Sequence, residues 1–124
     1  MSAPNIVNVV TITGKTATIA LSSTSATAIV SNAASSSKVF KINNVIVSNV
    51  DGTNAADITI SVYSQDDIGG TAYPVASTIS VPADTTLVVL DKNTALYLEE
   101  NKSIGAIASV ANDLVVVCSY EEIS

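Results

Sequence analysis

The chain has 124 residues, of which 48% are hydrophobic, 4% aromatic and 13% charged. This length is typical of one domain, and an apolar fraction made mainly of Val, Ile, Leu and Ala favours sheets over helices. The net charge is -6, histidine is absent, and the five basic residues are all lysines. Because they form no basic patch, we expect no direct binding to nucleic acid and none to membranes. The lysines are Lys15, Lys38, Lys41, Lys92 and Lys102.

The first part of the chain contains several β-prone runs. Residues 6–13 and 16–21 flank Gly14-Lys15, and because a type II′ turn requires glycine first, we expect an N-terminal hairpin there. Residues 26–31 give a weaker strand signal. The longest signal covers residues 39–50, with a bulge or bend expected at Asn43-Asn44.

A regular alternation of apolar and polar residues follows a turn at residues 51–54. Residues 66–70 are expected to form a flexible loop, and residues 75–81 form another strand, ended by Pro82-Ala83-Asp84. In the alternating segment, Ile58, Ile60 and Val62 are expected to point inward and Thr59, Ser61 and Tyr63 outward.

The last part of the chain has short β-prone runs separated by polar turns, which is typical of an antiparallel meander. Its final run is apolar on both faces, so we expect the other sheet, the N-terminal hairpin or a neighbouring subunit to cover it. The runs are residues 85–90, 95–98, 103–108 and 114–120. One face of the final run carries Leu114, Val116, Cys118 and Tyr120, and the other carries Val115 and Val117.

These runs predict an all-β fold, an antiparallel two-layer β-sandwich. We favour a jelly-roll-like topology over the immunoglobulin-like alternative, because the chain has no Trp and a single Cys. Residues 1–124 are expected to form one domain with an N-terminal hairpin or arm at about residues 1–31. The low charge fits either a surface rich in Ser, Thr and Asn or, as we favour, burial against other subunits in a homo-oligomer.

Two motifs resemble binding sites without fulfilling their requirements. Gly14-Lys15-Thr16 resembles the end of a phosphate-binding loop, but Val9 stands where that motif needs glycine, and a strand follows. Asp66-Asp67, with Asp51 and Asp57 upstream, offers oxygen ligands for calcium in a spacing that fits no calcium loop. We therefore assign no metal-binding and no cofactor-binding residue.

The chain lacks the usual parts of a catalytic site, and we expect no enzyme activity and no catalytic residue. Glu99-Glu100 and Glu121-Glu122 are paired carboxylates, but adjacent strand residues point to opposite faces, so we interpret both pairs as solvated strand ends. Cys118 lies on an apolar face and is interpreted as a buried small side chain. Tyr63 and Tyr97 are expected to face outward, and we interpret them as scattered surface or interface tyrosines in preference to aromatic platforms for a sugar. Asn101-Lys102-Ser103 is interpreted as a turn.

Residues 79–92, read as ISVPADTTLVVLDK, are followed by Leu96-Tyr97-Leu98-Glu99-Glu100, Ala111-Asn112-Asp113-Leu114 and Ser119-Tyr120-Glu121-Glu122-Ile123. This pattern of strands and turns resembles small virion structural proteins of tailed bacteriophages, most of all those of marine cyanobacterial myoviruses. The resemblance extends upstream through residues 41–62 and so covers most of the chain.

The resemblance implies a subunit made in the host cytoplasm and built into the virion. The expected function is capsid decoration, as a cement protein on the phage head, with the major capsid protein or other virion proteins as partners. A trimer is expected for a decoration protein, because three-fold positions on a shell favour three-fold partners. The alternatives are a neck or tail subunit and a fibre-tip module that binds a receptor or glycan.

Overall fold

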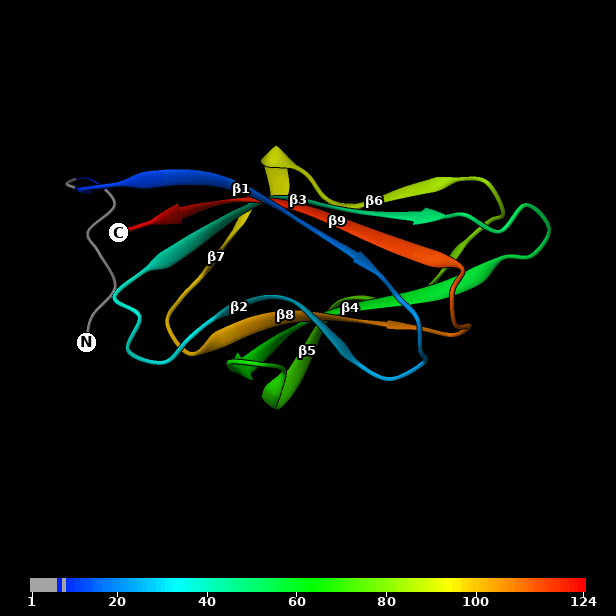
Figure 1. Ribbon diagram of the computed structural model, residues 1–124, viewed down its shortest axis with the longest axis horizontal. Coiled ribbons are helices and arrows are strands. Elements are labelled where there is room, and N and C mark those ends of the chain that lie inside the picture. The colour runs from blue at the N-terminus through cyan, green and yellow to red at the C-terminus, as the bar shows by residue number, and fades with distance from the viewer. Residues whose placement is uncertain (1–6, 8) are drawn as a thin grey trace.

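The computed structural model describes residue 7 and residues 9–124, which form two packed β-sheets (Figure 1). Apart from a 3-10 turn, η1, this part of the chain contains no helix. The elements are β1 (Ile12–Ala20), β2 (Thr27–Asn32), β3 (Val39–Asn49), β4 (Ala56–Gln65), β5 (Gly69–Val81), β6 (Thr86–Leu90), η1 (Lys92–Thr94), β7 (Leu96–Leu98), β8 (Lys102–Ala108) and β9 (Leu114–Ile123).

The strand order is that of a jelly roll, which confirms the predicted fold class. The first sheet has the order β1-β9-β3-β6, with the short β7 also paired to β3, and the second sheet has the order β2-β8-β4-β5. The pairs are antiparallel and nested: β4 with β5, β3 with β6, β2 with β8 and β1 with β9. The chain is thus one long hairpin, with its tip between β4 and β5, rolled up so that β9 meets β3 and β8 meets β4.

The expected C-terminal meander is wrong, although its four strands are present. β6 and β7 pair with β3, β8 lies in the second sheet, and β9 lies between β1 and β3. Consecutive strands of this segment therefore do not pair with one another. Polar turns mark where a strand ends, whereas the partner of each strand is set by long-range burial of apolar faces.

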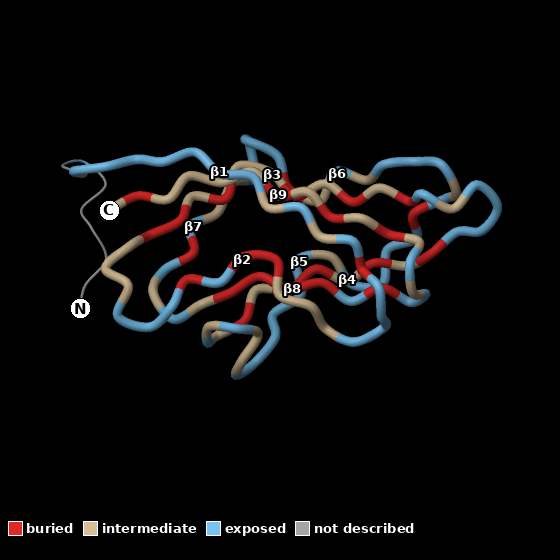
Figure 2. Tube along the Cα trace, viewed as in Figure 1, coloured by how far each residue is buried: buried red, intermediate tan, exposed pale blue. Residues whose placement is uncertain are grey.

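Buried residues lie along the strands of both sheets (Figure 2), and most of those in the core are aliphatic. Ile42, Val45 and Val47 of β3 face Ile58 and Ile60 of β4 from the opposite sheet, and all are fully buried. Each such side chain contributes roughly 1.5–3 kcal/mol when it leaves water. The bulge expected at Asn43-Asn44 is confirmed: the pairing of β3 with β9 shifts between Ile42 and Asn44. The shift keeps aliphatic residues inward on both of its sides.

The predicted N-terminal hairpin is wrong within the described residues. Gly14 and Lys15 lie inside β1, which pairs with β9 without interruption from Ile12 to Ala20. β9 offers a continuous partner along this whole stretch, and that pairing outweighs the local turn preference of Gly-Lys. Of the first strand expected in that hairpin, residues 6 and 8 lie outside the described part of the chain.

The alternation expected in β4 predicts correctly the face to which each side chain points. It is wrong about the exposure of Ser61 and Tyr63. Ile58 and Ile60 are in the core and Val62 packs against it, as predicted. Ser61 and Tyr63 point to the opposite face but are only 3% and 7% exposed. Ile68 of the β4–β5 turn lies beside Tyr63 on this face: a Cβ added to Gly105 would lie 2.7 Å from Ile68 Cγ2 and 2.9 Å from Tyr63 Cε1.

This turn is compact and anchored, in contrast to the flexible loop expected at residues 66–70. The backbone N–H of Asp67 donates to Ser31 Oγ at 2.8 Å, and that of Ile68 donates to Ser103 Oγ at 2.8 Å. Ser103 in turn donates to the carbonyl oxygen of Gln65. The tip of the long hairpin is therefore bound to β2 and β8, its neighbours in the second sheet.

Two buried asparagines tie segments that are distant in the sequence. The Asn32 amide donates to the carbonyl oxygens of Lys38 and Leu98 at 2.9 and 3.0 Å, linking β2, the β2–β3 loop and β7. The Asn49 amide donates to the carbonyl oxygens of Asn54 and Val81 at 3.0 and 2.8 Å. Removing a buried donor leaves its acceptors without partners, which is costly in an apolar interior.

We expect Asn32→Ala to lower the free energy of unfolding by about 2–3 kcal/mol, because the carbonyl oxygens of Leu98, in a buried hydrogen bond, and of Lys38, in a part-buried one, lose their donor. Urea unfolding followed by circular dichroism measures this value. Asn54→Ala is the matched control, since its side chain is exposed, and should change stability by less than about 0.5 kcal/mol. Equal effects of the two substitutions would contradict this role for Asn32.

Candidate functional site

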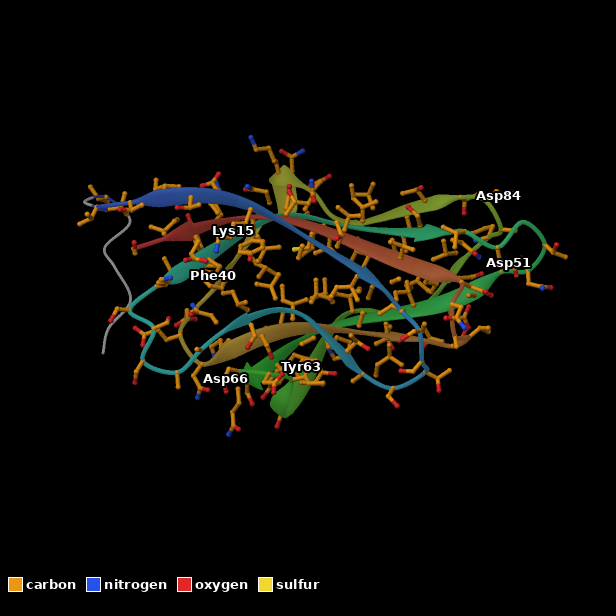
Figure 3. The ribbon with its side chains drawn as sticks, in the orientation of Figure 1. Lys15, Phe40, Asp51, Tyr63, Asp66 and Asp84 are labelled. Atoms are coloured by element: carbon orange, nitrogen blue, oxygen red, sulfur yellow. The ribbon has the colours of Figure 1, made fainter. Side chains whose placement is uncertain are left out.

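The acidic residues considered for calcium do not converge. Asp51 lies near the right-hand end of the sandwich and Asp66 lies far from it, below the lower sheet on the left-hand side (Figure 3). The Asp51 carboxylate accepts from the Thr53 backbone and the Asn54 amide, and that of Asp66 accepts from the Ala34 backbone. Within the described residues, no group of three or more His, Cys, Asp or Glu side chains is placed to hold a metal ion. These carboxylates stabilise turns.

Glu121 and Glu122 point to opposite faces of β9, as expected, but Glu122 is not a free, solvated strand end. Its carboxylate receives Lys15 Nζ of β1 at 2.9 Å and Lys38 Nζ of the β2–β3 loop at 2.5 Å. The Glu122 side chain is 16% exposed, and the two lysine side chains are 46% and 40% exposed. Glu121 accepts a hydrogen bond from the Asn43 amide.

The ion-pair cluster shifts the titration of its members. Hydrogen bonds from Lys38 and then Lys15 hold the pKa of Glu122 below its ordinary value. The same contact with Glu122 raises the pKa of Lys15. Tyr120, which packs on Phe40 with ring centroids 5.4 Å apart, has its pKa raised by burial. The cluster joins β1, β9 and the β2–β3 loop and contains no activated nucleophile.

Cys118 is fully buried, as predicted, among the core side chains of β9. Burial raises the pKa of its thiol to about 12. Because the thiolate is the reactive form, the side chain is inert in the folded protein. A disulfide between subunits through Cys118 is therefore incompatible with the folded state described here.

Three tyrosines that are distant in the sequence line one surface pocket of about 330 Å³. Tyr73 and Tyr97 are 60% and 48% exposed, whereas Tyr63 is only 7% exposed. The prediction that Tyr97 faces solvent is thus confirmed. The same prediction is wrong for Tyr63, because its side chain is buried. No sequence signal pairs these residues, because they come from different strands of both sheets. Val62, Ser64, Leu96, Glu99 and Lys102 complete the lining.

The outer face of the first sheet carries an apolar stripe. Val117 of β9 lies opposite Ile46 of β3, and Ile46 lies opposite Val88 of β6. Val115 continues the stripe along β9. Val88 is 55% exposed, and the other three are half-buried. In the described part of the chain, the second sheet packs on the other side of this sheet and no N-terminal hairpin forms, so neither covers Val115 and Val117. Cover by a neighbouring subunit, the third possibility, stays a prediction. We call Ile46, Val88, Val115 and Val117 the outer stripe.

No protein-family model and no curated protein sequence matches the chain. Among solved structures, it is similar to a subunit of Bacillus endospore appendages, described as disulfide-linked pili: 17% identity, TM-score 0.53, 92% of this chain and 88% of that one. A chain of the infectious bursal disease virus particle gives 8% identity and TM-score 0.50, over 93% of this chain and only 31% of that one. The Helicobacter pylori bacteriophage KHP30 capsid gives 12% identity and TM-score 0.49, over 94% of this chain and 90% of that one. At such low identity, the first two comparisons show a shared fold.

Among the described residues, no helix is long and apolar enough to cross a membrane.

The ion-pair cluster predicts a stability that falls in acid. Because the pKa of Glu122 is lowered in the folded state, its contribution is complete above the ordinary value of 4.5 and is lost as the pH falls through the folded-state value. We expect Glu122→Gln to cost about 1 kcal/mol or less at pH 7, since the lysines are well exposed. In urea unfolding between pH 7 and pH 3, the difference in free energy of unfolding between the wild type and Glu122→Gln should disappear as the pH falls. A difference that persists at pH 3 would rule out this origin, and Glu99→Gln is the control.

The buried thiol predicts slow chemical modification. At pH 8, a thiol reagent should modify Cys118 only as fast as the protein opens, and immediately after unfolding in urea, because the native thiol is both inaccessible and protonated. A Val88→Cys variant supplies an exposed thiol as control, which should react at once. Rapid modification of the wild-type protein would show that the β9 core opens readily.

Proposed function

We propose that this chain is a non-enzymatic structural subunit of a virion, which decorates the capsid of a tailed phage and stabilises its head. The observation that carries the proposal is the outer stripe, an apolar row across β9, β3 and β6 on the outer face of the first sheet. An apolar row with low surrounding charge is typical of a surface that is covered in an assembly. The jelly-roll fold, which viral capsid domains also use, is compatible with this role.

In this role the function is mechanical. The outer stripe lies against a neighbouring virion protein, with the major capsid protein as the expected partner, and the area buried there adds to the force needed to separate capsomers. The rigid double sheet transmits that force, because its ends are tied by the buried amides of Asn32 and Asn49. Residues of the turns remain in solvent. The subunit would be made in the host cytoplasm and finally located in the virion.

We further propose homo-oligomeric assembly, with a trimer as the order that a three-fold capsid position favours. A place in the neck or tail would use the same stripe against a different virion protein. The two locations differ in copy number, because a head is coated by many subunits and a neck or tail ring by few. Quantitative mass spectrometry of purified particles separates them.

A second candidate function, recognition of a receptor glycan at a fibre tip, has one observation in its favour. Tyr73 and Tyr97 present exposed rings at the pocket, and Glu99 and Lys102 supply hydrogen-bonding groups beside them. Sugar sites combine aromatic platforms with a few polar groups in this way. The pocket accounts for a ligand but leaves the outer stripe unexplained, so the structural role is preferred.

Adding purified protein to particles that lack it tests the proposal. We expect stoichiometric coating and higher heat resistance of the head, both lost in Val88→Glu because a buried, unpaired carboxylate opposes contact at the outer stripe. Ile107→Glu, on the outer face of the second sheet and 37% exposed, is the matched control and should still coat. Binding to a glycan array without particle binding, abolished by Tyr73→Ala, would replace decoration with the second candidate.

A further inference from the structure

The edge strands of the two sheets differ in how well they are protected against pairing. β5 has three register shifts and contains Pro74, and β2 is a six-residue strand with its own register shift. β6 and β7 are only five and three residues long. Bulges, proline and short length are the usual protections of an edge. β1 has none of them: it is nine residues long and its register with β9 is unbroken.

Alternate residues of β1 bond to β9, and, within the described part of the chain, the remaining residues have backbone groups that are free to pair with another strand. Thr11 and Ser124 exchange both of their backbone hydrogen bonds, and the Leu21 N–H donates to the Leu114 carbonyl oxygen. In an antiparallel ladder such pairs recur at every second residue. The odd-numbered residues of β1 therefore bond to β9, and the even-numbered ones direct N–H and C=O away from the sheet. The outward set is Ile12, Gly14, Thr16, Thr18 and Ala20.

The only charged side chain of β1 does not guard this edge. A lysine on an edge strand normally discourages pairing by holding its charge at the edge. Lys15 instead lies on the face that carries Glu122, where its ammonium group is bound by that carboxylate at 2.9 Å. Its charge is therefore balanced within the subunit, and the remaining residues of β1 are uncharged.

We infer that β1 is the site at which a second copy of this chain binds, through antiparallel pairing of the two β1 strands about a two-fold axis at Thr16. This register pairs all nine residues and opposes Thr16 to Thr16, Gly14 to Thr18 and Ile12 to Ala20, each a pair of outward-bonding residues. It forms about ten backbone hydrogen bonds. It also places Lys15 opposite Ala17, whereas centring the axis on Lys15 would oppose two lysines and shorten the overlap.

Paired in this way, the first sheets of two copies become one continuous sheet. A two-fold axis perpendicular to the sheet keeps the outer faces of both copies on the same side, so the outer stripes face the same way. The contact depends only on the geometry of β1 and holds whether or not the protein decorates a capsid. It is also independent of the proposed trimer, whose contact would use another part of the surface.

Disulfide trapping tests the register directly. In the inferred pair, the two Thr16 Cα atoms lie about 5.5 Å apart, within the range of a disulfide. Thr18 lies opposite Gly14, so the two Thr18 residues are offset by about 13 Å along the strands. With oxidised glutathione, Thr16→Cys should form a covalent dimer of twice the 12.6 kDa subunit mass, and Thr18→Cys should not. Cys118 adds no background because it is buried.

Equal cross-linking of the two variants, or none in either, would overturn the inference. The second result is also the one expected if the N-terminal residues of the same or another copy occupy the β1 edge. As a test without cysteine, Thr16→Lys should halve the mass of the wild-type assembly in sedimentation, and an equimolar mixture of Thr16→Lys with Thr16→Glu should restore it. An unchanged mass in Thr16→Lys, with a circular dichroism spectrum like wild type, would also contradict β1 pairing.

Discussion

The pairing of β1 with β9 closes the structure, and the rest of the sandwich depends on it. Thr16 and Ser119, which lie side by side there, are separated by 103 residues of chain. Closing so long a loop costs conformational entropy, which the burial of aliphatic side chains between the sheets must offset. The chain has few aromatic residues for that burial, so both sheets must be extended and regular. The Glu122 cluster and the buried amides of Asn32 and Asn49 then fix the ends of the sandwich.

Local sequence predicts the fold best where alternation is strong and burial is one-sided. In β3, the alternation and the bulge at Asn43-Asn44 are both visible in the sequence, because the apolar residues change phase there. Gly14-Lys15 shows the opposite case, since a local turn preference loses to a complete partner strand. Tyr63 shows a third case: its direction follows from the pattern, but its burial does not, and Ile68 lies beside it in a turn whose folding over the sheet has no periodic signal.

The candidate surfaces are less predictable than the fold for the same reason. Val115 and Val117 indicate an apolar outer face from the sequence alone, whereas the contribution of Ile46 and Val88 requires the pairing of β9 with β3 and of β3 with β6. The tyrosine pocket joins residues from both sheets. The availability of the β1 edge requires knowledge of which backbone groups β9 already uses. The expectation of no enzyme activity, in contrast, rests on residue types that can be read from the sequence without any structure.

In the two proposals, the outer stripe contacts a different virion protein and the β1 edge contacts a second copy of this chain. Locating the subunit in a reconstruction of the whole virion by electron cryomicroscopy tests this most directly. The account predicts jelly-roll density repeated over the head, with the outer face of the first sheet turned toward the shell. Density confined to a fibre tip, or particles in which the outer stripe faces solvent, would contradict it.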